Sequence, residues 1–357
     1  MKIVTVVGAR PQFIKAAVVS RALRTESRAK EILLHTGQHY DPNMSDIFFK
    51  ELDIPLPDYH LGIGGGSHGQ NTGRMIEAIE KVLSDENPDW VLVYGDTDST
   101  LAGTLAAAKL RIPVAHVEAG LRSFNRRMPE EINRVLADHA SSLLFAPTIT
   151  AADHLAKEGI EGNSVRLVGD VMYDAAIFYG TKAEQESSIM DRLGLNTGDF
   201  VLATVHRSEN TDDPTRLRAI MEGLATSDRT VILPLHPRTR HRLHEAGGIP
   251  SAPIRIIEPV GYLDMVMLER HAAMIATDSG GVQKEAYFQK VPCITLRDET
   301  EWVELVDIGV NRLVGADKVR IREALRSTRR NERWPPLYGD GHAGRLIAYA
   351  LHENTGG

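Results

Sequence analysis

Short runs of apolar and β-branched residues alternate with helical segments along the whole chain. Continuous apolar runs are typical of strands buried on both faces, and strands that alternate with helices form parallel sheets. The runs that we expect to form strands are residues 1–8, 31–36, 90–94, 114–117, 142–145, 165–168, 200–205, 230–235, 254–257, 272–276 and 293–296. The sequence therefore predicts an α/β fold with parallel sheets.

The alternation starts again near residues 169–174, in the middle of the chain. We therefore expect two Rossmann-like domains that face each other across a cleft. Ligands of such sheets bind beyond the carboxyl ends of the strands. The residues that follow strands, and that we expect to share the cleft, are Arg10, Asp96, Glu118, His206, His236 and Ser279.

The stretch 277–285 (TDSGGVQKE) joins one of these strands to a helix that we expect over residues 282–289. Glycines at Gly280 and Gly281 allow an anionic group to approach the unpaired N–H groups of the helix start. Glu285 lies about one helical turn further and is suited to accept hydrogen bonds from ribose hydroxyls. The stretch is predicted to hold a nucleotide diphosphate; the alternative is an ordinary turn capped by Ser279.

Two cations lie near the first helix, which we expect over residues 13–23. Arg10 occupies the turn that precedes it, and Lys15 lies in its first turns. Positive charge at a helix N-terminus opposes the helix dipole. A bound anion would explain both residues, and solvent-exposed charge is the alternative.

Several acids and histidines are expected around the same cleft. Asp96 and Glu118 end strands, Glu130 begins a helix, and His206 and His236 follow strands of the second half. Such a group suits general acid–base chemistry, because crowded carboxylates raise one another's pKa. As alternatives, Asp96 would cap a helix, and Glu118 and Glu131 would pair with Arg122 and Arg134. No spacing indicates a metal site.

Composition excludes some classes of protein. The net charge of −7 gives no electrostatic footprint for nucleic acid or an anionic membrane. We expect the first four residues to begin a strand and not a signal peptide, and no apolar run reaches transmembrane length. Cys293, the one cysteine, cannot form an internal disulfide. We expect a cytoplasmic enzyme with no nucleic-acid or membrane partner.

Eight short motifs occur together along the chain. They are residues 8–11 (GARP) with Lys15, 95–97 (GDT), 116–122 (HVEAGLR), 129–134 (PEEINR), 206–207 (HR), 278–285 (DSGGVQKE), 297–298 (RD) and 338–341 (YGDG). In this combination the chain resembles the non-hydrolysing UDP-N-acetylglucosamine 2-epimerases, essentially from end to end.

The resemblance implies a glycosyltransferase-B-like fold and a dimer, with no metal and no nicotinamide cofactor. It implies domains at 1–170 and 171–338 and a terminal segment, 339–357, that returns to the first domain. It also implies a reaction in which UDP is eliminated from a UDP-linked 2-acetamido sugar, leaving a bound glycal that is re-protonated at C2 from the other face. Asp96, Glu118, Glu130 and His206 would form the acid–base group. The residues that would hold the UDP-sugar are Arg10, Lys15, Arg134, His236, Ser279, Gly280, Gly281 and Glu285.

Some positions depart from the common pattern of the family. Gln12 and Phe13 follow the GARP turn, Met265 replaces a usual Phe, and Trp302 replaces a usual Arg. These variants resemble the subgroup that acts on UDP-2,3-diacetamido-2,3-dideoxyglucuronate. Arg127 or Arg126 would then pair with the extra sugar carboxylate, and we expect residues 12–13 and 126–127 to select the sugar.

Three other functions compete with this interpretation. UDP-N-acetylglucosamine would be the alternative epimerase substrate. A retaining glycosyltransferase would use the same nucleotide site but needs an acceptor. A nucleotide-sugar sensor would keep Ser279 and Glu285 and tolerate loss of Asp96 or Glu118.

Overall fold

The structure is a computed structural model that describes residues 1–27, 29–38, 53, 56–235, 237–245, 248, 252–327 and 334–354, with backbone only at Arg10, Pro237 and Arg238. The chain forms two compact units. Unit 1 comprises Met1–Ile177 and Pro336–Gly357, and unit 2 comprises Phe178–Pro335. The sequence also predicts a helix near residues 44–52, and this stretch lies outside the described residues.

Unit 1 contains a seven-stranded sheet in the order β3-β2-β1-β4-β5-β6-β7, and all its strand pairs are parallel. Its strands are β1 (Lys2–Val7), β2 (Lys30–His35), β3 (Tyr59–His60), β4 (Trp90–Tyr94), β5 (Val114–Val117), β6 (Leu143–Ala146) and β7 (Val165–Leu167). This strand order is that of a Rossmann-like sheet, in which the order reverses between β1 and β4. Apolar residues of β1, β2 and β4 are fully buried there, among them Val4, Val6, Leu34 and Val91.

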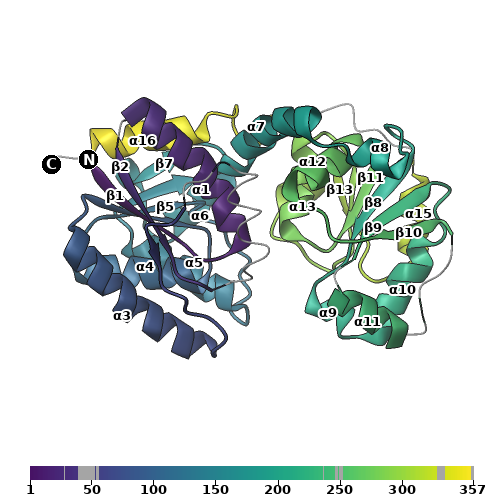
Figure 1. The fold of residues 1–357 in the computed structure, drawn as a ribbon, viewed down its shortest axis with the longest axis horizontal. Coiled ribbons are helices and arrows are strands. Elements are labelled where there is room, and N and C mark those ends of the chain that lie inside the picture. Colours follow the sequence, from purple (N-terminus) through teal and green to yellow (C-terminus); the bar gives the residue numbers. More distant parts are fainter. Residues whose placement is uncertain are drawn as a thin grey trace. The chain divides into compact units, whose positions relative to one another are not determined.

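Helices cover both faces of this sheet. They are α1 (Arg10–Ala22), α3 (His68–Glu86), α4 (Asp98–Lys109), α5 (Pro129–Ala140), α6 (Ile149–Lys157), the start of α7 (Val171–Glu186) and α16 (Ala343–Glu353), with a π-helical turn at Leu23–Ser27 and a 3₁₀ turn at Gly162–Ser164. Figure 1 shows α1 and α16 on one side of the sheet and α3 and α4 on the other. The C-terminal helix α16 therefore packs in the first unit, although the second unit precedes it in the chain.

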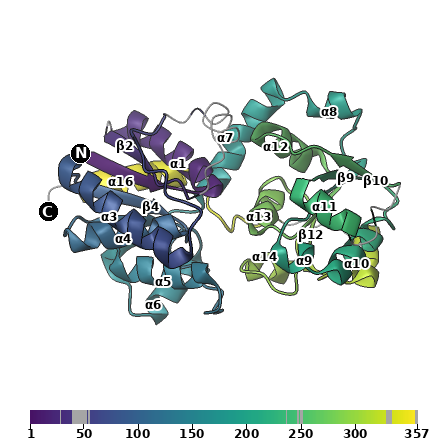
Figure 2. The ribbon, with the colours of Figure 1, turned by 60° about the horizontal axis from the view of Figure 1, so that its bottom comes forward.

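Unit 2 repeats the arrangement with six parallel strands in the order β10-β9-β8-β11-β12-β13. Its strands are β8 (Phe200–Thr204), β9 (Thr230–Pro234), β10 (Ile254–Ile257), β11 (Met274–Thr277), β12 (Cys293–Thr295) and β13 (Asn311–Leu313). Its helices are the remainder of α7, α8 (Ile189–Leu193), α9 (Ser208–Thr211), α10 (Pro214–Leu224), α11 (Pro237–Glu245), α12 (Tyr262–His271), α13 (Gly280–Phe288), α14 (Val303–Asp307) and α15 (Lys318–Arg326). Figure 2 shows α9, α10 and α11 close together, in agreement with their mutual contacts.

Candidate active site

Two carboxylates and two cations meet at the carboxyl ends of β4 and β5. Asp96 follows β4 and Glu118 follows β5, and these strands are neighbours in the sheet. Lys15 of α1 places its Nζ 2.5 Å from the Glu118 carboxylate. Arg134 of α5 donates to the Asp96 carboxylate and, at 3.1 Å, to Glu131. The sheet topology therefore gathers charges of both signs from four separate stretches of the chain.

Asp96 is an acid of the site and not a helix cap. Thr97 occupies the N-cap position of α4, where its side chain accepts a hydrogen bond from the backbone of Thr100. Loss of hydration is the largest influence on Asp96 and raises its pKa above the usual range, against the opposing effects of Arg134 and Lys15. The charge of Glu118 raises this pKa further but is a smaller cause. Desolvation, more than crowding with other carboxylates, therefore favours a proton on Asp96.

Glu118 has a strained backbone. Its φ is +72°, in the left-handed region that residues with a side chain rarely adopt. Its N–H donates to Phe145 O of β6 at 3.1 Å, which helps to hold this conformation. The alternative in which Glu118 pairs with Arg122 is wrong, because Glu118 pairs with Lys15 and Arg122 pairs with Asp138 and Glu158. Strain of this kind is common at active sites.

Helix α5 supplies most of the remaining contacts to the Asp96 turn. Asn133 donates to the Asp96 carbonyl at 3.0 Å, while Arg134 binds the Asp96 carboxylate. Glu131 contacts Arg134 and the hydroxyl of Ser123, so the alternative in which Glu131 pairs with Arg134 is confirmed. Glu130 lies exposed in the first turn, and no described residue forms a hydrogen bond or ion pair with its side chain. The structure thus brings Asp96 and Glu118 together with Lys15 and Arg134, and leaves Glu130 at the surface.

In unit 2, the buried Asp278 holds the His206 turn. The strands that precede these two residues, β11 and β8, are neighbours. The Asp278 carboxylate accepts hydrogen bonds from the backbone N–H groups of His206 and Arg207, each at 3.1 Å, and from the side chain of Asn210. The His206 ring lies 3.3 Å from the same carboxylate, with 57% of its side chain exposed. These hydrogen bonds hold the backbone that carries an accessible imidazole, at the carboxyl ends of the strands of the second sheet.

The N-terminus of α13 is capped by Ser279, whose side chain accepts a hydrogen bond from Val282. Gly280 and Gly281 form its first turn, where backbone N–H groups lack partners within the helix. A Cβ at Gly280 would lie 2.1 Å from a carboxylate oxygen of Glu301, so a side chain there would require the end of Glu301 to move. Arg297 holds Glu301 at 2.9 Å. A carboxylate thus already lies against this helix start, where the helix dipole favours negative charge.

Glu285 shares a hydrogen bond with Glu269 of α12. Burial first, and then the charge of Glu285, raise the pKa of Glu269 well above its usual range. The raised pKa favours a proton on Glu269, which then donates the hydrogen bond that it shares with Glu285. This neighbour gave no signal in the sequence, because an acid inside an apolar helix face looks like a surface charge until the packing is known.

The other predicted site residues lie outside this charge cluster or outside the described residues. Arg127 is exposed. The side chain of Arg10 and the whole of His236 lie outside the described residues. Gln12 and Phe13 are buried: the Gln12 amide binds the backbone of Gly8, Ala9 and Tyr94, and Phe13 stacks on His35. Their part in selecting the sugar stays a prediction.

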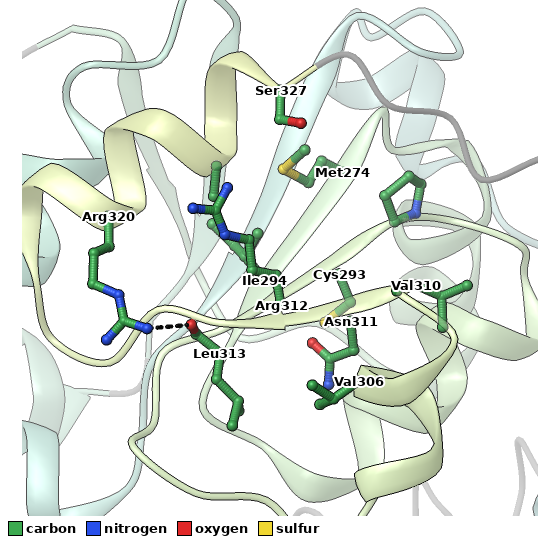
Figure 3. A pocket seen from close by; sticks show the side chains of 13 residues that line it. Met274, Cys293, Ile294, Val306, Val310, Asn311, Arg312, Leu313, Arg320 and Ser327 are labelled. Atoms are coloured by element: carbon green, nitrogen blue, oxygen red, sulfur yellow. Dashed lines mark hydrogen bonds between the residues drawn. The ribbon is translucent and has the colours of Figure 1, made fainter.

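A pocket of about 660 Å³ lies at the amino ends of strands β11, β12 and β13 in the second sheet. It is lined by Met274, Cys293 and Asn311, which begin β11, β12 and β13, and by Arg312 and Arg320 (Figure 3). Since Ser279 follows the other end of β11, this pocket is separate from the predicted nucleotide site. Among the described residues there is no cluster of acids, histidines and cysteine that could hold a metal, and no helix long and apolar enough to cross a membrane.

Comparison with known proteins gives one consistent result. The sequence model of the UDP-N-acetylglucosamine 2-epimerase family matches residues 21–352. The chain is 52% identical to the UDP-2,3-diacetamido-2,3-dideoxy-D-glucuronate 2-epimerase of Pseudomonas aeruginosa, over 98% of this chain and 99% of that protein. It is 47% identical to the UDP-N-acetylglucosamine 2-epimerase of Methanocaldococcus jannaschii, over 98% and 99% of the two chains.

Solved structures agree. The crystal structure of the M. jannaschii enzyme in complex with UDP-GlcNAc and UDP matches with a TM-score of 0.90 and 46% identity, over 99% of this chain and all of that one. The enzyme of Neisseria meningitidis bound to UDP-GlcNAc matches with a TM-score of 0.89 and 32% identity, over 99% and 100% of the chains. The predicted α/β fold of the glycosyltransferase-B-like type is confirmed. The chain belongs to the UDP-N-acetylglucosamine 2-epimerase family, a family of isomerases.

Proposed function

We propose that the protein inverts C2 of a UDP-linked 2-acetamido sugar by eliminating UDP and adding it back. The observation that carries this proposal is the charge cluster of Asp96, Glu118, Lys15 and Arg134, in which two carboxylates differ in environment. Elimination needs a base that accepts the C2 proton, and re-addition needs an acid that supplies one from the other face. Two inequivalent carboxyl groups can divide these roles.

The environments suggest which group does which task. Lys15 Nζ lies 2.5 Å from the Glu118 carboxylate, and we propose that this ion-paired carboxylate accepts the proton from C2. Asp96, with its raised pKa, is suited to donate one. In the forward step the C2–H and C1–O bonds break, a C1=C2 double bond forms, and UDP leaves with the electron pair of the C1–O bond. Re-addition reverses each change, with the new C2–H bond on the opposite face. Glu130 and His206 remain proposed members of the acid–base group.

The departing diphosphate carries negative charge, and stabilising it lowers the barrier to elimination. We propose that the backbone N–H groups of Gly280 and Gly281 at the start of α13, together with the Ser279 hydroxyl, bind this charge. Glu285, held as an acceptor by Glu269, would receive the ribose hydroxyls. Arg10, Lys15 and His236 remain proposed UDP-sugar ligands, and Arg134 is proposed to act through Asp96.

The proposed substrate is UDP-2,3-diacetamido-2,3-dideoxyglucuronate, on which the P. aeruginosa relative acts according to its name. The exposed Arg127 is available to bind the sugar carboxylate as a bidentate partner. UDP-N-acetylglucosamine is the second candidate, since it is bound in the M. jannaschii structure. Replacing Arg127 by Ala should lower kcat/KM for the uronate by about tenfold or more while sparing the neutral sugar. Arg126→Ala, which changes the adjacent exposed arginine, tests the alternative partner: a selective loss for the uronate in this variant alone would assign the contact to Arg126.

Proton exchange at C2 tests the reaction itself. Each UDP-sugar is incubated with the protein in deuterated water, and C2 is followed by NMR. We expect deuterium at C2 together with the new epimer, and we expect Asp96→Asn and Glu118→Gln to lose both while still binding UDP. If neither sugar exchanges, the epimerase proposal fails. Transfer of the sugar to an added acceptor without C2 exchange would instead support a glycosyltransferase.

We also propose that the enzyme is a homodimer of the cytoplasm. The dimer is the state expected from the resemblance of the motifs, and light scattering at micromolar concentration tests it. A mass equal to one chain of 39.4 kDa would refute the dimer. Cell fractionation tests the location, and recovery of the protein with membranes or outside the cell would refute it.

A further inference from the structure

A series of buried hydrogen bonds connects the two turns that carry the charge cluster of Asp96, Glu118, Lys15 and Arg134. His116 of β5 contacts Asp138 of α5 with one ring nitrogen and the Gly95 carbonyl with the other, both at 2.7 Å. The second oxygen of Asp138 accepts from the backbone N–H of Gly120 at 3.1 Å and from Arg122 at 2.7 Å. This chain of contacts connects the turn after β4 with the turn after β5. These are the turns that carry Asp96 and Glu118.

We propose that His116 and Asp138 form a positioning pair that fixes the two catalytic carboxylates. The proposal rests on the function proposed above, because it assigns a role in the same reaction. Neither residue is a catalytic residue: both act through the backbone of the turns. The sequence placed His116 and Asp138 in or beside motifs but gave no sign that they meet.

The directions of the His116 hydrogen bonds follow from the partners of its ring. A carbonyl oxygen can only accept, so the His116 nitrogen that faces Gly95 carries a hydrogen. The other nitrogen faces the Asp138 carboxylate, and an ionised carboxylate also only accepts. Burial raises the pKa of Asp138, but the bonds from His116 and Arg122 outweigh it, and the pKa of this carboxyl falls below its usual range.

The backbone that this pair holds is unusual. Gly95, Glu118 and Gly120 all have positive φ, of 63°, 72° and 83°. For a residue with a side chain, such as Glu118, this conformation costs about 1–3 kcal/mol and persists only where neighbouring contacts enforce it. The His116 and Asp138 bonds reach Gly95 and Gly120, one residue before Asp96 and two residues after Glu118. They are therefore placed to prevent either turn from relaxing.

Because the network is buried, it contributes more to the position of the two turns than to the stability of the fold. The side chains of His116 and Asp138 are 0% exposed, and that of Arg122 is 1% exposed. Arg122 also binds Glu158 through two bonds of 2.7 and 2.8 Å, so it pairs with two carboxylates of the network. Removing charges from water offsets most of their attraction, and such groups can instead serve conformational specificity. A misplacement of about 1 Å in a catalytic group can lower a rate by about 10²-fold.

Two substitutions that reverse the direction of the hydrogen bonds give a sharp test. In His116→Gln, one amide nitrogen replaces two ring nitrogens. The amide oxygen then faces one of the two acceptors, and one hydrogen bond between the turns is lost. In the double variant H116Q/D138N, the amide that replaces the Asp138 carboxylate accepts from Gly120 and Arg122 through its oxygen. Its NH₂ group donates to the amide at position 116, which donates in turn to Gly95. Asp138→Asn alone keeps the chain through a neutral His116 and should be mild.

Three readouts are compared for the four proteins: kcat for C2 deuterium exchange, the Kd for UDP, and hydrogen exchange of the Gly120 amide. We expect His116→Gln to lower kcat by about 10²-fold with unchanged Kd and a faster Gly120 amide. We expect the double variant to regain about tenfold or more of kcat and the slow amide. In the wild-type protein, NMR of labelled histidine should find two protected ring N–H groups, and both signals should vanish in His116→Gln.

Three results would overturn the positioning role. They are wild-type kcat in His116→Gln, a double variant no better than His116→Gln, or a fall in UDP affinity that matches the fall in kcat. Absence of C2 exchange in the wild-type protein would refute the proposed reaction. The Gly120 amide and the ring N–H signals would then still decide whether the pair holds the turns, so the two failures are distinguishable.

Discussion

Two buried groups of unit 1 should give its stability opposite dependences on pH. Asp174 of α7 accepts hydrogen bonds from Ala343 and Gly344 at the start of α16, and burial nevertheless raises its pKa from 3.8 to about 6. His35 at the end of β2 is buried between the rings of Phe13 and His60, and burial lowers its pKa from 6.5 to about 4.

The signs follow from proton linkage. Folded Asp174 binds a proton more tightly than unfolded Asp174, so it costs stability above pH 6, and this cost disappears as the pH falls from about 6 to 3.8. Folded His35 binds a proton less tightly, so its contribution is present above pH 6.5 and is lost as the pH falls to about 4. Each shift is worth about 3 kcal/mol at 1.36 kcal/mol per pKa unit. In the wild-type protein the two effects should largely cancel.

Asp174→Asn removes one of the two titrations. The free energy of unfolding of this variant should fall by about 3 kcal/mol between pH 6.5 and 4, where the wild type changes little. Urea unfolding at a series of pH values, followed by hydrogen exchange of peptides from β1 and β4, reports on unit 1 alone. The double variant with His35→Gln is the control and should be nearly flat. A constant difference between Asp174→Asn and wild type over this range would refute the reasoning.

Three further predictions concern the site. Lys15→Met leaves Glu118 without its cation in a site where their side chains are only 9% and 11% exposed, and should cost about 3 kcal/mol in urea unfolding; adding Glu118→Gln should restore stability but not C2 exchange. Gly280→Ala should weaken UDP binding by about tenfold or more in calorimetry, since its Cβ meets a carboxylate oxygen at 2.1 Å, while at Gly281 the nearest atom lies 3.8 Å away and Ala should be tolerated. Glu269→Gln keeps a neutral donor toward its carboxylate partner on α13 and should retain UDP affinity, whereas Glu269→Leu should lose it.

Each of these has a result that would contradict it. If Lys15→Met is as stable as the wild type, or the double variant is no more stable than Lys15→Met, the ion pair does not control this region. Equal UDP affinity in the Gly280→Ala and Gly281→Ala variants would show that the carboxylate near Gly280 moves freely. Equal UDP affinity in the Glu269→Gln and Glu269→Leu variants would refute the role of the hydrogen bond that Glu269 donates.

The sequence by itself determined the fold class and much of the site. Strands buried on both faces are written as apolar runs, so β4, β5 and β10 were predicted with the bounds that the structure has. The rule that sites lie at the carboxyl ends of parallel strands selected Asp96 and Glu118, because topology alone brings those ends together. Shorter elements such as β13, three residues with one Asn and one Arg, carry no such pattern and were missed.

Only the tertiary structure decided which charges meet and which protonation states result. A sequence does not say whether Glu118 pairs with Lys15 or with Arg122, because both lie within reach of a strand end. Nor does it reveal that Asp96 is desolvated, that Glu269 approaches Glu285, or that His116 lies between two acceptors. These properties depend on distances of a few ångströms between distant stretches of the chain, and the dielectric environment and the hydrogen-bond partners at those distances determine the chemistry.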